Sequence, residues 1–165
     1  MSITSEIFQT WRHPAQAMAR RLAQGPREDR AIAVLMGACL LAFVAQWPRL
    51  AREAHFNGLS GQPGLPDLQA LMGINLFALL FIAPLALYAV AGLSQLLLRL
   101  FGVRVSGYGA RIALFWALLA TAPLMLLQGL VAGFVGPGPG LHLLGVLVGL
   151  GFLWLWLRLL RAARQ

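Results

Sequence analysis

The chain has 165 residues, of which 59% are hydrophobic and only 11% are charged. A soluble domain usually carries about 25% charged residues, so this composition excludes an ordinary water-soluble domain and predicts a protein surrounded mainly by lipid. The net charge is +8, and all the basic residues are arginines. These arginines flank apolar segments instead of forming one basic face. We therefore expect their partners to be anionic lipid headgroups and not nucleic acid.

Residues 1–30 form the first unit, a basic segment with five arginines and three acids. The first long apolar run begins only at Ala31, unlike the run of a secretory signal. We therefore predict no cleaved signal, but one or two short amphipathic helices at the membrane interface. Pro14 suits the first turn of such a helix, and Gly25-Pro26 ends it.

Residues 31–165 form the second unit, which we predict to be all-α, a polytopic bundle of four transmembrane helices. A bilayer core about 30 Å thick needs about 20 apolar residues per helix. The clearest stretch is 112–157, which has no charged side chain and only one strong break, the GPGPG sequence at 136–140. The predicted spans are approximately 31–47, 71–98, 112–134 and 141–157.

Local signals set the boundaries within the first two spans. Asp29 is predicted to cap the first span, and Pro48 is predicted to end it. Residues 49–56 would then form a separate interfacial helix. The uncharged stretch 68–98 exceeds one perpendicular crossing, so we expect the second span to be tilted, or kinked at Pro84. The five tryptophans are predicted interfacial anchors: Trp11, Trp47, Trp116, Trp154 and Trp156.

Arginine is divided unequally between the two sides of such a bundle. Four spans place both tails and the connection between the second and third spans on one side, which holds eleven arginines, against only Arg49 and Arg52 on the other. The positive-inside rule makes the richer side cytoplasmic. We therefore predict a bacterial inner-membrane protein with both termini in the cytoplasm. The arginines expected to bind headgroups are Arg12, Arg20, Arg21, Arg99, Arg104, Arg111, Arg158 and Arg161.

No pattern in the sequence predicts catalysis, a metal or a cofactor. The chain lacks a nucleophile elbow, a zinc-protease motif and a phosphate-binding loop. His142 is the only histidine or charged residue within the predicted spans, and no second histidine is expected to face it across a haem or a metal. We therefore expect a protein that is not an enzyme and that has no catalytic, cofactor-binding or metal-binding residues. The scarcity of ionisable groups also disfavours a proton- or sodium-coupled transporter.

Small residues recur four positions apart in the last two spans, at Gly129 and Gly133 and at Gly145 and Gly149. Such stripes allow helix backbones to approach closely. They could bind another chain or pack the third and fourth spans against each other. The short hairpin makes these two spans neighbours, which favours packing within the chain.

The sequence Trp11-Arg12-His13-Pro14, then Ala19-Arg20-Arg21-Leu22, then Ala31 opening the first span resembles the bacterial branch of the Yip domain family. Its eukaryotic members are Ypt/Rab-interacting membrane proteins with a cytosolic N-terminal segment and four or five spans. The resemblance implies a non-enzymatic organiser that binds partner proteins. GTPase binding is not carried over to this short chain with an arginine-dominated face.

We therefore expect an integral membrane protein that binds anionic lipids and other integral membrane proteins, as a Yip-like scaffold. One alternative is an accessory subunit of a large respiratory or photosynthetic complex. Another is a transporter or channel for a neutral or lipidic solute, in which Pro84, Pro123, Asn75 and Gln128 would support a broken-helix path. Against this, no pair of interrupted helices recurs in symmetrical halves.

Overall fold

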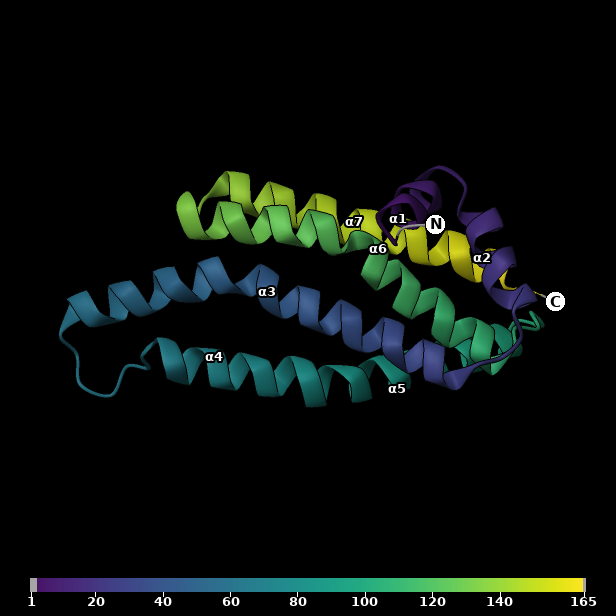
Figure 1. Ribbon diagram of the computed structural model, residues 1–165, viewed down its shortest axis with the longest axis horizontal. Helices are drawn as coiled ribbons and strands as arrows, with labels where there is room; N and C mark the ends of the chain where they lie inside the picture. The colour runs from purple at the N-terminus through teal and green to yellow at the C-terminus, as the bar shows by residue number, and fades with distance from the viewer. Residues whose placement is uncertain (1–2, 165) are drawn as a thin grey trace.

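The computed structural model describes residues 3–164, which form seven α-helices and one π-helical turn (Figure 1). Four units within this range are long and apolar enough to cross a membrane, so the chain is an all-α, multi-pass membrane protein with a four-helix bundle. In chain order the elements are α1 (Ile3–Arg12), α2 (Pro14–Ala23), α3 (Glu28–Ser60), α4 (Leu68–Phe77), η1 (Ala78–Ile82), α5 (Ala83–Leu100), α6 (Gly107–Phe134) and α7 (Pro139–Ala162).

The four membrane-length units run back and forth along the molecule. They are α3, the continuous α4–η1–α5, α6 and α7. Figure 1 shows the connections 61–67 and 135–138 at one end, and the connection 101–106 at the other end near the C-terminus; α1 lies further in on that same half, beside α6 and α7. An isolated bridge between Val105 and Arg164 ties the C-terminal end to that connection. The arginine-rich segments therefore share one end of the bundle.

The first span continues through Pro48, which corrects its predicted end at Trp47 and the separate helix over 49–56. Proline removes one helical hydrogen bond and crowds the preceding turn. Neighbouring packing holds the helix here, because Gly133 of α6 lies against Pro48. One turn later, Arg52 Nη1 donates to the Gly133 carbonyl oxygen at 3.1 Å. Asp29 is also not the N-cap, since the helix begins one residue earlier, at Glu28.

The second span contains an irregular turn at the place where the sequence predicts a kink. The π-helical turn η1 ends two residues before Pro84, whose missing N–H removes a bond to the preceding turn. The helix begins at Leu68, earlier than predicted, because the carboxylate of Asp67 caps it by accepting a hydrogen bond from the Ala70 N–H at 2.8 Å. α6 and α7 also begin earlier than predicted, and α7 extends to Ala162.

The core of the bundle lies around α6. Half of its most apolar stretch is buried, whereas only 6% of the corresponding stretch of α4–η1–α5 is buried. Ile112, Phe115 and Leu119 of α6 belong to a core that also contains Leu35 of α3 and Leu155 of α7. The protein is therefore built around α6, and α4–η1–α5 is the membrane-length unit with the most exposed surface.

Gly129 and Gly133 face α3, and the prediction that they pack α6 against α7 is wrong. A Cβ at Gly129 would lie 1.7 Å from the carbonyl oxygen of Ala45, and one at Gly133 would lie 2.4 Å from Pro48 Cβ. The hairpin does make α6 and α7 neighbours, but it does not decide which face of α6 carries the close contact. Gly145 packs toward Gln128 of α6, at 3.0 Å from its Nε2 to an added Cβ. Gly149 faces open space, which corrects its prediction as a helix-packing residue.

We predict that Gly129→Ala lowers the stability of the bundle while Gly149→Ala does not. The added methyl at position 129 must push α3 away, at a cost of roughly 1–3 kcal/mol, whereas alanine at position 149 gains about 0.5–1 kcal/mol of helix propensity without a clash. Thermal unfolding of the purified protein in detergent measures the difference. Equal melting temperatures for the two variants would contradict the close α3–α6 contact.

Candidate functional site

The predicted amphipathic helices at the N-terminus are present, and they pack on the membrane bundle. Pro14 opens α2 as predicted, and Gly25, with a φ of 79°, follows its end. α1 contacts α6, and α2 contacts α7 (Figure 1). Thr10 and Met18 become fully buried in this contact. The N-terminal segment is therefore part of the folded bundle and covers one side of it.

Two indole groups join α1 to α6. Trp116 Nε1 donates to Thr10 Oγ1 at 2.9 Å, and the Thr10 hydroxyl donates to the Glu6 carbonyl oxygen at 2.7 Å. Trp11 Nε1 donates in the opposite direction, to the carbonyl oxygen of Ala120, at 2.9 Å. These bonds hold α1 in a defined register along α6.

These contacts correct part of the predicted tryptophan belt. Trp116 is buried beneath α1, and Trp11 is bonded to α6 and stacked on Trp154, so neither indole N–H is free to anchor the chain at the interface. Trp156 is partly buried against the core. Trp47 and Trp154 are nearly half exposed, and their role as anchors stays a prediction.

Arg21 forms a largely buried ion pair beside the same indole. Its Nη2 lies 2.8 Å from Glu6 Oε2, and only 12% of its side chain is exposed. Its guanidinium lies 3.2 Å from the ring centroid of Trp116, a cation–π contact. Burial lowers the pKa of Arg21, while Glu6 acts in the opposite direction and the group stays charged. This arginine holds α1 and α2 together, which corrects its prediction as a headgroup ligand.

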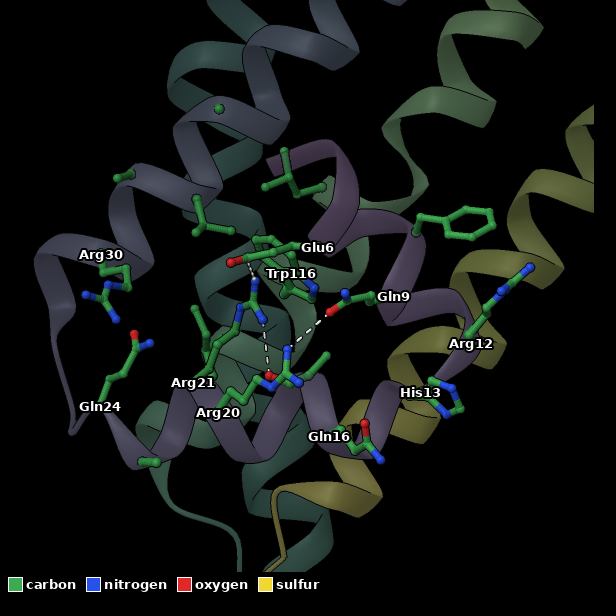
Figure 2. Close-up of a pocket in the computed structure, with 18 of the residues that line it drawn as sticks. Glu6, Gln9, Arg12, His13, Gln16, Arg20, Arg21, Gln24, Arg30 and Trp116 are labelled. Carbon is green, nitrogen blue, oxygen red and sulfur yellow. Dashed lines mark hydrogen bonds and ion pairs between the residues drawn. The ribbon is translucent and has the colours of Figure 1, made fainter. Parts of the chain in front are cut away.

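A groove of about 1420 Å³ lies between α1–α2 and the first half of α3 (Figure 2). One wall is polar and comes mainly from α1 and α2, whereas the opposite wall and the floor are apolar and come from α3 and α6. Phe8 on α1 and Leu40 on α3 both line the groove and are 59% and 48% exposed, so part of its apolar lining lies at the surface of the protein. A ligand with a polar end and an apolar body matches this division.

The groove carries more positive charge than its carboxylate can balance. Its lining includes four arginines, but Glu6 is the single acid and it is paired with Arg21. Arg20 Nη1 donates only to the neutral amide oxygen of Gln9, at 3.1 Å, and Arg12 lies over the Phe8 ring. Among residues 3–164, neither Arg12, Arg20 nor Arg30 forms an ion pair with a carboxylate. The groove is therefore electrostatically suited to an anion.

The other arginines predicted to bind headgroups are not brought into this groove. Arg111 pairs with Glu28 and so joins α6 to α3. The remaining ones lie at the same end outside the groove: Arg99, Arg104, Arg158 and Arg161. The sequence prediction did not include Arg30 among the arginines that bind headgroups. Its position immediately before the apolar run at Ala31 could have indicated a cation at the end of a span.

The amides that could support a path for solutes are separated in the structure. Asn75 Nδ2 donates to the Leu71 carbonyl oxygen of its own helix, at 3.0 Å, and Gln128 packs at Gly145. Within the described part of the chain, no cluster of three or more His, Cys, Asp or Glu residues could hold a metal. The groove beside α1–α2 is therefore the stronger candidate site.

No family model, curated protein or solved structure matches this chain. The resemblance to the Yip domain family rests on the residues quoted above, and it stays a prediction.

We predict that Thr10→Val loosens α1 from the bundle, whereas Thr121→Val does not. Both hydroxyls are fully buried, but that of Thr121 bonds only to Ala117 of its own helix, while Thr10→Val leaves the Trp116 N–H without its acceptor. A buried unpaired donor costs about 1–3 kcal/mol, so amide hydrogen exchange in α1 should accelerate roughly tenfold or more. Equal exchange rates in the two variants would show that this bond does not hold α1.

Proposed function

We propose that this chain is a non-enzymatic protein of the bacterial inner membrane, with both termini in the cytoplasm. It binds anionic lipids at its arginine-rich end and partner membrane proteins along its lipid-facing helices, as a scaffold. The observation that carries the proposal is the shortage of carboxylates at the arginine-rich end.

Within residues 3–164, each Asp or Glu side chain at that end is already paired with one arginine. Glu6 pairs with Arg21, Asp29 pairs with Arg27, and Glu28 pairs with Arg111. The chain has only two further acids, Glu53 and Asp67, and both lie toward the opposite end. The arginines left over at the first end can be neutralised by anionic headgroups, each contributing about 1 kcal/mol near a charged membrane surface.

The same imbalance supports the orientation. Eleven arginines belong to the end that contains both tails, and two belong to the other. Lysine and arginine are concentrated in cytoplasmic segments near the ends of spans. The arginine-rich end therefore faces the cytoplasmic leaflet, where anionic lipids also attract basic segments.

Partner binding is supported by the exposed surface of the second span. Ile74, Phe77, Phe81 and Leu85 are all more than half exposed on α4–η1–α5. This surface is apolar over its whole length, so it suits either lipid tails or the helices of another membrane protein. A role as an accessory subunit of a larger complex would use the same surface.

We predict that the protein extracted from native membranes in polymer-bounded lipid discs is enriched in anionic phospholipids and carries at least one other membrane protein. The double variant Arg104→Gln/Arg161→Gln should lose part of the lipid enrichment, because both arginines lie at the basic end. Arg49→Gln, at the opposite end, is the matched control. Lipid and protein mass spectrometry measure the contents of the discs. Bulk lipid composition around the wild type, together with no co-purifying protein, would refute the proposal.

We predict from the orientation that reporters fused at Ser106 and at the C-terminus are active on the cytoplasmic side. A reporter inserted at Gly64, between α3 and α4, should be active on the periplasmic side. Paired alkaline phosphatase and fluorescent-protein fusions at each position measure this. Opposite locations for Ser106 and the C-terminus would show that α6 and α7 do not both cross the membrane, and would contradict the four-span topology.

A further inference from the structure

We propose that the groove between α1–α2 and α3 is a stoichiometric site for one anionic phospholipid. Its phosphate lies between Arg20 and Arg30, and one acyl chain lies along α3 from Ala33 to Leu41. The inference rests on the proposed function, since it assigns one particular lipid site at the end of the bundle where anionic lipids are expected to gather.

Cationic side chains surround the polar end of the groove. Figure 2 shows Arg20 and Arg21 reaching from α2 toward Gln9 and Glu6 of α1, with Arg30 and Gln24 on the other side. Burial is the main cause that lowers the pKa of Arg21, and repulsion from the positive charge of Arg30 adds to it. An anion between the two sides would relieve this repulsion.

A phosphate fits this arrangement better than a carboxylate does. Guanidinium and amide donors stand on two sides of the polar end, so a bound anion must accept hydrogen bonds in more than one direction. Phosphate oxygens do this, and arginine binds them through paired, charge-assisted hydrogen bonds. A phosphate that binds Arg20 would not have to displace a carboxylate, because Arg20 donates only to the neutral side-chain amide of Gln9.

The apolar wall of the groove is formed by α3. Ala33, Val34, Gly37, Leu40 and Leu41 lie on one face of α3 and all line the groove. Gly37 leaves open space on this face, since an added Cβ would have no atom within 4 Å. This wall offers a shallow track in which an acyl chain can lie against the helix.

The length of this track matches one leaflet of a bilayer. The helix rises roughly 16 Å from Arg30 to Leu41, about half of a hydrocarbon core near 30 Å thick. A phosphate at Arg30 therefore places the end of its acyl chain near the middle of the membrane. Leu40, toward the end of the track, is 48% exposed, so the track is accessible from the surface of the protein. The groove also exceeds the roughly 300–1,000 Å³ of common small-molecule sites.

The test is native mass spectrometry of the full-length protein in detergent, titrated with phosphatidylglycerol. We expect one tightly held lipid per chain. Arg30→Gln should weaken its binding about tenfold or more, as expected for the loss of a charged hydrogen bond. Gly37→Leu should weaken it at least as much by filling the acyl track, while the melting temperature stays unchanged because the site is open. The matched controls are Arg104→Gln and Gly149→Leu, which lie outside the groove.

Two further arms identify the source of the anion. Phosphatidylethanolamine, which is zwitterionic, should bind in the groove at least tenfold more weakly than phosphatidylglycerol. Inorganic phosphate should not displace the lipid at phosphate concentrations that keep the protein soluble, because inorganic phosphate makes no contact with the apolar wall. Displacement by inorganic phosphate, or equal binding of the two lipids, would overturn the assignment.

The groove and the proposed function can fail separately. If Arg30→Gln and Gly37→Leu keep the bound lipid while Arg104→Gln/Arg161→Gln reduces the anionic enrichment in native discs, the groove assignment is wrong and the proposed function stands. If the groove holds one phosphatidylglycerol but the surrounding lipids show no anionic enrichment, the groove assignment stands and the general preference is wrong.

Discussion

The hydrogen bond between Trp116 and Thr10, covered by the Arg21 guanidinium, is the interaction on which the rest of this end depends. It lies well inside the bundle, and the neighbouring bond from Trp11 reaches Ala120, roughly 13 Å along α6 from Arg111. At such a depth an unpaired donor has little water to turn to and its cost rises. The two indole hydrogen bonds thus hold the N-terminal helices against α6. The groove exists only with these helices in place, because they form its wall opposite α3.

The groove has one polar and one apolar wall because the two walls come from segments of different composition. α1 and α2 come from a polar, arginine-rich segment, whereas α3 and α6 are apolar helices of membrane length. Docking one on the other leaves charge along one side and hydrocarbon along the other. The amphipathic character of the site is therefore a consequence of the packing and needs no dedicated binding motif.

Much of the architecture could be predicted from the sequence, because a charge-free stretch such as 112–157 has few alternatives to the membrane. The hairpin at 136–140 and the helix start at Pro14 follow from local backbone chemistry in the same way. Pro48 misled the prediction because tertiary contacts from α6 override its local preference. The partners of Gly129 and the burial of Trp116 depend on which helices meet, and a single sequence does not encode this locally. The groove escaped prediction for that reason, since its walls are distant in the chain.

Burial decides which of two neighbouring arginines is structural and which is available to a ligand. Arg21 lies under α1, where an unpaired charge would be costly, and it therefore takes the groove's one carboxylate, Glu6. Arg20, the preceding residue, is exposed and needs no such partner, because water or a headgroup can solvate it. A second acid in the groove would neutralise Arg20 or Arg30 and remove the attraction for an anion. The scarcity of carboxylates at this end thus leaves Arg20 and Arg30 without an ion-pair partner among the described residues and keeps the groove positively charged.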